Sequence, residues 1–253
     1  MNNPWTMKME QFTSFTDEQR RRLDDIVSTR QKDYPARTDI LTEGEKVDEC
    51  HVILSGLAAR YKILENGERQ IMAFLVPGDL CDAEVFILEE MDHSVMALSD
   101  TRCAIIPAKT MRELLREVSA LAEALWWGTM TDLAVLRERI VDHGRRNARE
   151  RVAHLLYEVL VRYRIAGATD GDTFSFPVTQ EELADATGMT PVHLNRTLQQ
   201  LRAEGLIEFR NKTLNITDPE GLKKIALFNS NYLHLKRTER GDSEVVQRAG
   251  DLV

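Results

Sequence analysis

The sequence predicts an α+β protein in which an antiparallel barrel or sandwich is followed by a long helix and a winged helix-turn-helix. Three observations lead to this prediction. Four glycines between residues 44 and 78 recur at intervals of 12, 11 and 11, with short apolar runs between them. No proline interrupts the chain between Pro107 and Pro177, and apolar residues recur at helical spacing over much of this segment. Residues 179–216 then contain two capped helices and a hairpin.

Length and composition fit a globular protein of two compact domains or one large domain. The 253 residues are 43% hydrophobic and 29% charged. No transmembrane helix is expected, because no apolar run reaches the required length of about eighteen residues. Residues 1–12 lack the apolar core and cleavage site of a signal peptide, which indicates a cytoplasmic protein. Cys50, Cys81 and Cys103 are odd in number and unevenly spaced, so we expect reduced thiols.

The net charge of −8 is unevenly distributed along the chain. Residues 1–143 carry 17 Lys and Arg against 26 Asp and Glu, whereas residues 144–217 carry 10 against 9 and residues 218–253 carry 6 against 6. The acidic excess therefore belongs to the N-terminal part, where it can simply maintain solubility. The total charge does not exclude nucleic-acid binding by the later segments.

Residues 1–118 are assigned to the first domain. Thr16 is expected to cap a short helix. Asn66 and Gly67 predict a hairpin turn over 65–68, because both residues tolerate positive φ. Strand-like runs lie at residues 50–56, 57–64, 69–76, 94–98 and 102–107.

A long helix over residues 119–143 follows, with Ser119 as its expected cap. Trp126 and Trp127 are adjacent and cannot share one helix face. We expect one face to pack on the barrel and another on a second copy of the chain, in a parallel dimer. Burial of both faces within one subunit is the alternative. The residues proposed for the dimer helix are Leu121, Leu125, Trp126, Met130, Leu133, Leu136 and Ile140.

Residues 144–230 are assigned to a second domain, with residues 143–146 as a candidate hinge and a helix over about 147–165. Thr179 and Glu182 fit a capping box at the start of a short helix. Thr190 is a good N-cap, and Pro191 then falls at the first helical position, where its missing N–H costs nothing. The two helices and the glycine-containing turn between them predict a helix-turn-helix.

The outer face of the second helix carries no acidic residue between positions 192 and 200. Arginine suits guanine or phosphate, Asn and Gln suit adenine edges, and valine suits a thymine methyl group. A hairpin with a basic tip follows over residues 207–216 and predicts a wing. The residues proposed to bind DNA are Thr179, Thr190, Val192, His193, Asn195, Arg196, Gln199, Gln200, Arg210 and Lys212. Residues 231–253 are expected to be a polar tail, either mobile or with a partly ordered extra helix.

These features resemble the Crp/Fnr family of bacterial transcription regulators, from about Pro35 to Ala226. The resemblance covers the barrel with its regularly spaced glycines, the VPGDL turn at 76–80, the long helix and the helix-turn-helix segment from Thr179 to Ile207. It implies a cyclic-nucleotide-binding-like β-roll, a dimerisation helix and a homodimer that reads a palindrome in double-stranded DNA. It also implies RNA polymerase as a partner and an effector that reorients the domains.

Two departures from the family limit what the resemblance implies. Family recognition helices often carry Glu, then Ser or Gly, then Arg, whereas Val192, Asn195 and Arg196 stand here. Cyclic-nucleotide binders hold the phosphate with an arginine, but residues 78–98 contain six acids and no Lys or Arg. Tight cyclic AMP binding is therefore not expected. The candidate effector pocket comprises Gly78, Asp79, Cys81, Asp82, Glu84, Asp92, His93 and Ser94.

No cofactor, metal or enzymatic activity is predicted. Three cysteines cannot supply a four-cysteine cluster, and lone His51, His93 or Cys81 are more often ordinary barrel residues than haem or metal ligands. Cys81 is either a redox thiol or a small buried hydrophobe. G-x-S-x-G and H-E-x-x-H motifs are absent from the sequence. A ligand sensor or scaffold that acts through protein contacts without DNA is the alternative function, disfavoured by the basic wing.

Overall fold

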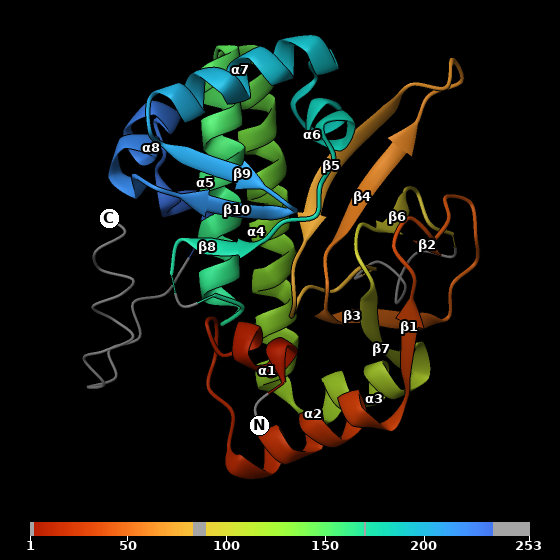
Figure 1. The fold of residues 1–253 in the computed structure, drawn as a ribbon. Helices are drawn as coiled ribbons and strands as arrows, with labels where there is room; N and C mark the ends of the chain where they lie inside the picture. Colours follow the sequence, from red (N-terminus) through yellow and green to blue (C-terminus); the bar gives the residue numbers. More distant parts are fainter. Residues whose placement is uncertain (1–2, 83–89, 170, 235–253) are drawn as a thin grey trace.

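A computed structural model describes residues 3–82, 90–169 and 171–234. Its N-terminal part combines two helices with a β-roll, and the C-terminal part is a winged helix-turn-helix (Figure 1). The first part contains α1 (Pro4–Met9), α2 (Asp17–Thr29), β1 (Gln31–Tyr34), β2 (Asp39–Leu41), β3 (Glu49–Ser55), β4 (Ala58–Ile63), β5 (Arg69–Leu75), β6 (Ser94–Ala97) and β7 (Thr101–Pro107). It forms two antiparallel sheets, ordered β1-β7-β3 and β2-β6-β4-β5.

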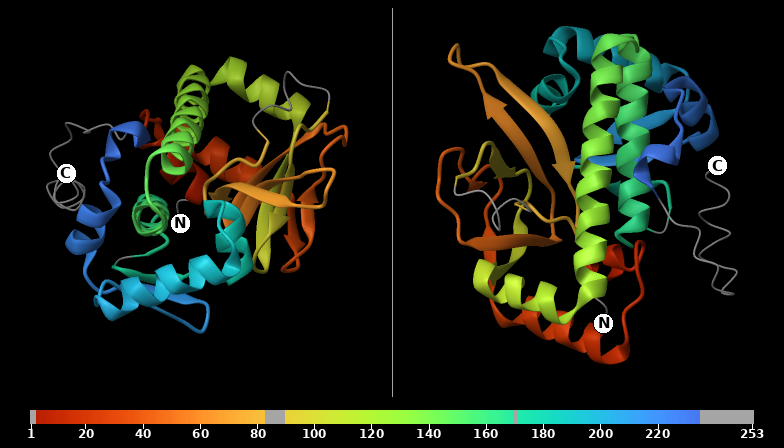
Figure 2. Two further views of the ribbon diagram at one scale, coloured as in Figure 1. Left: turned by 90° about the horizontal axis from the view of Figure 1, so that it is seen from above. Right: turned by 180° about the vertical axis from the view of Figure 1, so that it is seen from behind.

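The remaining elements complete the α+β architecture that the sequence predicts. They are α3 (Ala108–Glu117), α4 (Ser119–Gly144), α5 (Ala148–Ile165), β8 (Thr173–Ser175), α6 (Gln180–Thr187), α7 (Pro191–Ala203), β9 (Ile207–Arg210), β10 (Thr213–Ile216), α8 (Pro219–Ala226) and a 3-10 turn η2 (Ser230–Leu233). The long helices α4 and α5 lie side by side between the β-roll and the winged helix-turn-helix (Figure 2). Among the described residues, no helix is both long and apolar enough to span a bilayer.

Several local predictions are confirmed. Thr16 caps α2 in a capping box with Gln19. The five predicted strand runs correspond to β3, β4, β5, β6 and β7. The β4–β5 hairpin turns at the predicted place, but only Gly67 takes positive φ. Asn66 contributes instead through its side chain, which accepts a hydrogen bond from the Glu68 N–H.

Other predictions are wrong in detail. Ser119 does not cap the long helix: Val118 is the cap residue, and Ser119 is already the first helical residue. The tail does not begin at residue 231, because Tyr232 hydrogen-bonds to Glu158 and Leu233 is 3% exposed. The rest of the predicted tail, residues 235–253, lies outside the described residues. Elements α1, β1, β2 and β8 were not predicted, since each is too short for a clear periodic signal.

One hydrophobic core joins the two domains. Phe74 from β5 and Phe176, which follows β8, are both fully buried and meet edge to face, with ring centroids 5.4 Å apart. The same cluster includes Tyr61 and Leu98 of the β-roll and Leu198 of α7. The second domain is therefore packed on the first rather than tethered to it.

Candidate nucleic-acid interface and effector cavity

Helix α6 is fixed at both ends. At its start, Thr179 Oγ1 accepts from the Glu182 N–H and Glu182 Oε2 accepts from the Thr179 N–H, as the capping box predicts. At the turn itself, Gly188 has φ 61°, a left-handed conformation that ends α6. A Cβ at this position would lie 3.0 Å from the His143 ring, so space as well as conformation favours glycine.

Pro191 begins α7, as predicted. It occupies the first helical turn, and the side chain of the cap residue Thr190 accepts from the His193 N–H at 3.3 Å. Leu194, Leu198 and Leu201 are fully buried and anchor the inner face of the helix. This anchoring exposes the opposite face along its length.

The outer face of α7 carries the predicted DNA-binding side chains. Val192 is 65% exposed, and His193, Arg196, Gln199 and Gln200 are exposed as well. Asn195 is half-buried, and its amide donates to Gln180 Oε1 of α6 at 2.9 Å. Thr179 and Thr190 use their hydroxyl groups as helix caps. The structure thus places together the α7 side chains that the sequence proposed.

The wing is a three-stranded sheet in the order β8-β10-β9. Its turn residues Asn211 and Lys212 both have positive φ, at 50° and 61°. Arg210 and Lys212 are exposed at the tip. The tip points toward the β-roll (Figure 1), and Lys212 lines a groove whose other wall includes Leu98 and Asp100. In this domain arrangement the tip faces the β-roll, whereas α7 runs across the top of the domain in Figure 1.

A cavity of about 200 Å³ lies between the β-roll and α4. Asp92 and His93 line it, and the His93 Nε2 atom is buried without a hydrogen-bond partner. The acidic run at 78–98 does not alone determine the charge of this cavity, because basic side chains reach it from elsewhere in the chain. The cavity wall includes Arg60, Lys62 and Arg162 together with Met72, Leu75, Asp132, Val135 and Leu136.

Most other residues of the predicted effector pocket have structural roles. Asp82 accepts from the His51 N–H at 2.9 Å and pairs with His51 Nδ1 at 2.8 Å. Ser94 Oγ accepts from the Glu43 N–H, and Gly78 takes φ 90° beside the Pro4 carbonyl. Cys81 is fully buried, and a hydrogen bond with Cys103 together with burial raises its pKa. This favours the buried-hydrophobe interpretation of Cys81. Glu84 lies outside the described residues.

Asp79 joins three segments of the chain. Its carboxylate pairs with Lys8 at 2.5 Å and with Arg162 at 2.6 Å, and it accepts from the Val76 N–H. Burial alone would raise the pKa of Asp79, but the two cations outweigh burial and lower it. Asp79 therefore connects α1, the β-roll and α5.

Two stretches of the chain match known protein families. Residues 31–118 match the cyclic nucleotide-binding domain, and residues 150–225 match the Crp-like helix-turn-helix domain. The nitrogen fixation regulation protein FixK of Rhizobium meliloti is 28% identical over 195 residues, which cover 76% of this chain and 85% of FixK. The transcriptional activator protein FnrL of Cereibacter sphaeroides is 26% identical over 184 residues, or 72% of this chain and 73% of FnrL. The chain belongs to the Crp/Fnr family of transcription regulators.

The solved structure of FixK2 from Bradyrhizobium japonicum supports the fold of this Crp/Fnr chain. It matches with a TM-score of 0.70 at 24% identity, covering 78% of this chain and 96% of FixK2. At this identity the likeness concerns the fold alone. The Crp/Fnr assignment agrees with the absence of an enzymatic motif from the sequence.

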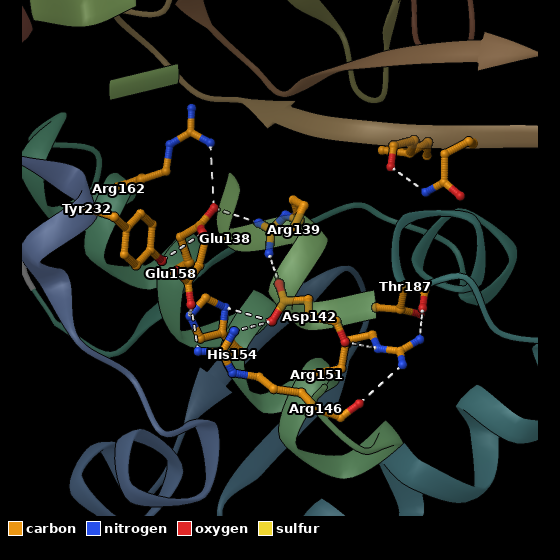
Figure 3. Close-up of polar contacts among 12 residues, drawn as sticks. Glu138, Arg139, Asp142, Arg146, Arg151, His154, Glu158, Arg162, Thr187 and Tyr232 are labelled. Carbon is orange, nitrogen blue, oxygen red and sulfur yellow. Dashed lines mark hydrogen bonds and ion pairs between the residues drawn. The ribbon is translucent and has the colours of Figure 1, made fainter. Parts of the chain in front are cut away.

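A buried ionic network joins α4 and α5 of this Crp/Fnr protein (Figure 3). Arg139 donates to Asp142 at 2.8 Å and to Glu158 at 2.6 Å. Arg146 donates to Asp142 at 2.8 Å and to Glu138 at 2.6 Å. Burial would raise the pKa of Asp142, but His154 and Arg139 lower it to about 2. Because the predicted hinge residue Arg146 is part of this network, the α4–α5 junction is held in place here.

Arg151 extends the network to the helix-turn-helix. Its guanidinium donates to the Asp142 carbonyl at 2.9 Å and to the Thr187 carbonyl, at the end of α6, at 2.8 Å (Figure 3). On the other side, Arg162 lines the cavity and pairs with Asp79. Because Arg162 also lies 4.0 Å from Glu158, charged side chains run from the cavity between the β-roll and α4 to the end of α6.

The proposed dimer helix α4 presents an exposed apolar stripe. Trp126, Leu133 and Ile140 are seven residues apart and 68%, 40% and 73% exposed, and Leu136 is 44% exposed. Leu121 is fully buried within the subunit, and Leu125 and Met130 are half-buried, so these three do not belong to the stripe. The ring of Trp127 stacks on Phe12 with ring centroids 6.2 Å apart. The adjacent tryptophans thus face different surroundings, as expected.

Proposed function

We propose that this protein is a sequence-specific, DNA-binding transcription regulator that acts as a homodimer on a palindromic operator. The exposed, acid-free outer face of α7 carries the proposal, because it offers one arginine and three amide side chains at the spacing of a major-groove reader. RNA polymerase is the partner proposed from the family resemblance. A scaffold that does not bind DNA would not need this face.

Selection of bound sequences from random double-stranded DNA tests the proposed function. We expect enrichment of two inverted half-sites whose centres lie about 10 base pairs apart, or a multiple of that distance. The salt concentration must be stated, because phosphate contacts make affinity strongly salt-dependent. Failure to enrich any sequence across a range of salt concentrations contradicts the proposal.

Arg196 is expected to be the chief base-reading side chain. Arg196→Ala should weaken binding to the selected operator by about 1–3 kcal/mol and relax the preference at one base position. Arg210→Ala at the wing tip is the control. The tip faces the β-roll here and is proposed to reach the DNA backbone when the domains reorient, so this variant should weaken binding to all sequences alike. Fluorescence anisotropy with the operator and single-base variants measures both effects. If Arg196→Ala weakened binding to all DNA sequences equally, Arg196 would contact a phosphate instead of a base.

The exposed stripe on α4 is proposed as the dimer interface. Ile140→Glu should weaken dimerisation by on the order of 100-fold or more, because a buried carboxylate would lack a partner. Light scattering after size exclusion should change from about twice the chain mass of 28.9 kDa to the monomer. Ile63→Glu, at another exposed isoleucine on the β4–β5 hairpin (56% against 73% for Ile140), should remain dimeric. A wild-type chain that is monomeric at micromolar concentration contradicts the proposal.

The effector cavity is proposed not to bind cyclic AMP tightly. Arg60 pairs with Asp132 at 2.9 Å and Arg162 pairs with Asp79, so both guanidinium charges are already compensated. An added phosphate would also meet the Asp92 and Asp132 carboxylates that line the cavity. Isothermal titration should therefore show no micromolar affinity for cyclic AMP, and such an affinity would contradict this part of the proposal.

A further inference from the structure

The two helices of the helix-turn-helix are joined on their solvent side by a pair of amide side chains. Gln180 is the first residue of α6, and its Oε1 atom accepts a hydrogen bond from Asn195 Nδ2 at 2.9 Å. Asn195 lies on the outer face of α7, between the exposed Val192 and Gln199. A residue from the first helix thus contacts the face proposed to read DNA.

The backbones that carry these two amides are held rigidly. The capping box of Thr179 and Glu182 surrounds Gln180 and fixes the first turn of α6. Leu194 and Leu198, buried on either side of Asn195 in the sequence, fix α7 against the core. The hydrogen bond therefore restrains the Asn195 side chain between two fixed elements, whereas its neighbour Arg196 is exposed.

The bond determines which polar groups Asn195 offers to DNA. A carboxamide has two N–H donors and one carbonyl acceptor. One donor is directed at Gln180, which leaves the carbonyl oxygen and the second N–H. In the major groove, adenine presents the N6 donor beside the N7 acceptor, and an asparagine side chain matches this pair with its oxygen and one N–H. The remaining groups of Asn195 are those that adenine requires.

We propose that Gln180 is a positioning residue that orients Asn195 to read an adenine in each half-site. This inference rests on the proposed function. Without Gln180, the Asn195 amide can rotate, and it then loses the fixed order of acceptor and donor on which discrimination between bases depends. Gln180 acts on base preference through Asn195, and its own contact with the base is not required.

The experiment uses the DNA selected by the full-length wild-type protein and all single-base variants of one half-site. Asn195→Ala should reduce the preference for adenine at one position by roughly 5-fold or more. Gln180→Ala should reduce the preference at the same position, and this effect should disappear in the Asn195→Ala background. Gln180→Glu retains the Oε1 acceptor, so it should keep the adenine preference while weakening binding to all sequences through its charge.

Asn215→Ala is the matched control, since Asn215 is a half-buried amide of the same domain that lies outside the residues proposed to bind DNA, and its Oδ1 accepts from Thr173 Oγ1. This variant should leave the preference at the adenine position unchanged. The inference is overturned if Gln180→Ala weakens all sequences equally, or if its effect persists without Asn195. It is also overturned if the position that responds to Asn195→Ala does not prefer adenine. A wild-type protein that enriches no sequence contradicts the proposed function itself, which is a different outcome.

Discussion

Arg139→Met is expected to lower the free energy of unfolding by about 3–5 kcal/mol, because it removes the cation that two buried carboxylates share. Arg146 still pairs with Asp142 at 2.8 Å, whereas Arg162 lies 4.0 Å from Glu158, so most of the lost compensation falls on Glu158. Asp142 and Glu158, which both accept from Arg139, are 1% and 0% exposed. Methionine fills much of the same space, so the loss reflects the uncompensated charges more than a cavity. Thermal denaturation should show a midpoint lower by roughly 6–20 °C for a chain of this size.

The control for Arg139 is an ion pair on the surface. Arg22 and Glu117 pair at 3.3 Å with side chains that are 56% and 57% exposed. Arg22→Met should change stability by under about 1 kcal/mol, since water and salt already screen such a pair. Equal effects of the two substitutions would show that the buried network does not stabilise the α4–α5 junction.

Phe176→Ala is the second substitution expected to have a large effect, about 3–5 kcal/mol of destabilisation. Phe176 is 0% exposed and contacts Phe74 of the β-roll as well as Phe174 and Phe209 of the second domain. The cavity left by the ring would weaken both the C-terminal domain and its packing on the β-roll. Denaturant titration measures the stability, and hydrogen exchange should show faster opening of α6.

Leu64→Ala is the matched control for the loss of apolar atoms. Leu64 is 58% exposed at the β4–β5 turn, so its truncation should change stability by no more than about 0.5 kcal/mol. If Phe176→Ala had an effect as small as this, the shared core would not couple the domains. Faster exchange in β9 and β10 without any change in α6 would also contradict the coupling.

The proposed DNA-binding face could be predicted from sequence because its signals are local. Thr179 with Glu182 and Thr190 with Pro191 specify helix starts within four residues. Once these starts are known, helical periodicity assigns Leu194 and Leu198 to the core and Arg196 to the outside. The Asn195–Gln180 hydrogen bond was not predicted. It joins residues of two helices, and the angle at which these helices cross cannot be derived from a local sequence pattern.

The lining of the cavity between the β-roll and α4 could not be predicted, because its charged side chains come from distant parts of the chain. Residues 78–98 contain no Lys or Arg, yet Arg60 and Arg162 line the cavity beside Asp92. Asp79 has the right position in the sequence for a ligand-binding residue, but Lys8 and Arg162 neutralise it inside the fold. Pairing across 71 and 83 residues of chain depends on tertiary packing, which hydrophobic periodicity does not describe.

The packing of both chain ends has a consequence for defining a minimal fragment. Trp5, Phe12 and Leu23 are buried before residue 31, where the first family match begins, and Phe228 and Leu233 are buried after residue 225, where the second ends. A fragment trimmed to the matched ranges would lack these side chains, and the apolar surfaces that they cover would be exposed to water and would favour aggregation. The two matched ranges are therefore shorter than the segment whose side chains form the core. A deletion series on this protein should retain residues 3–234.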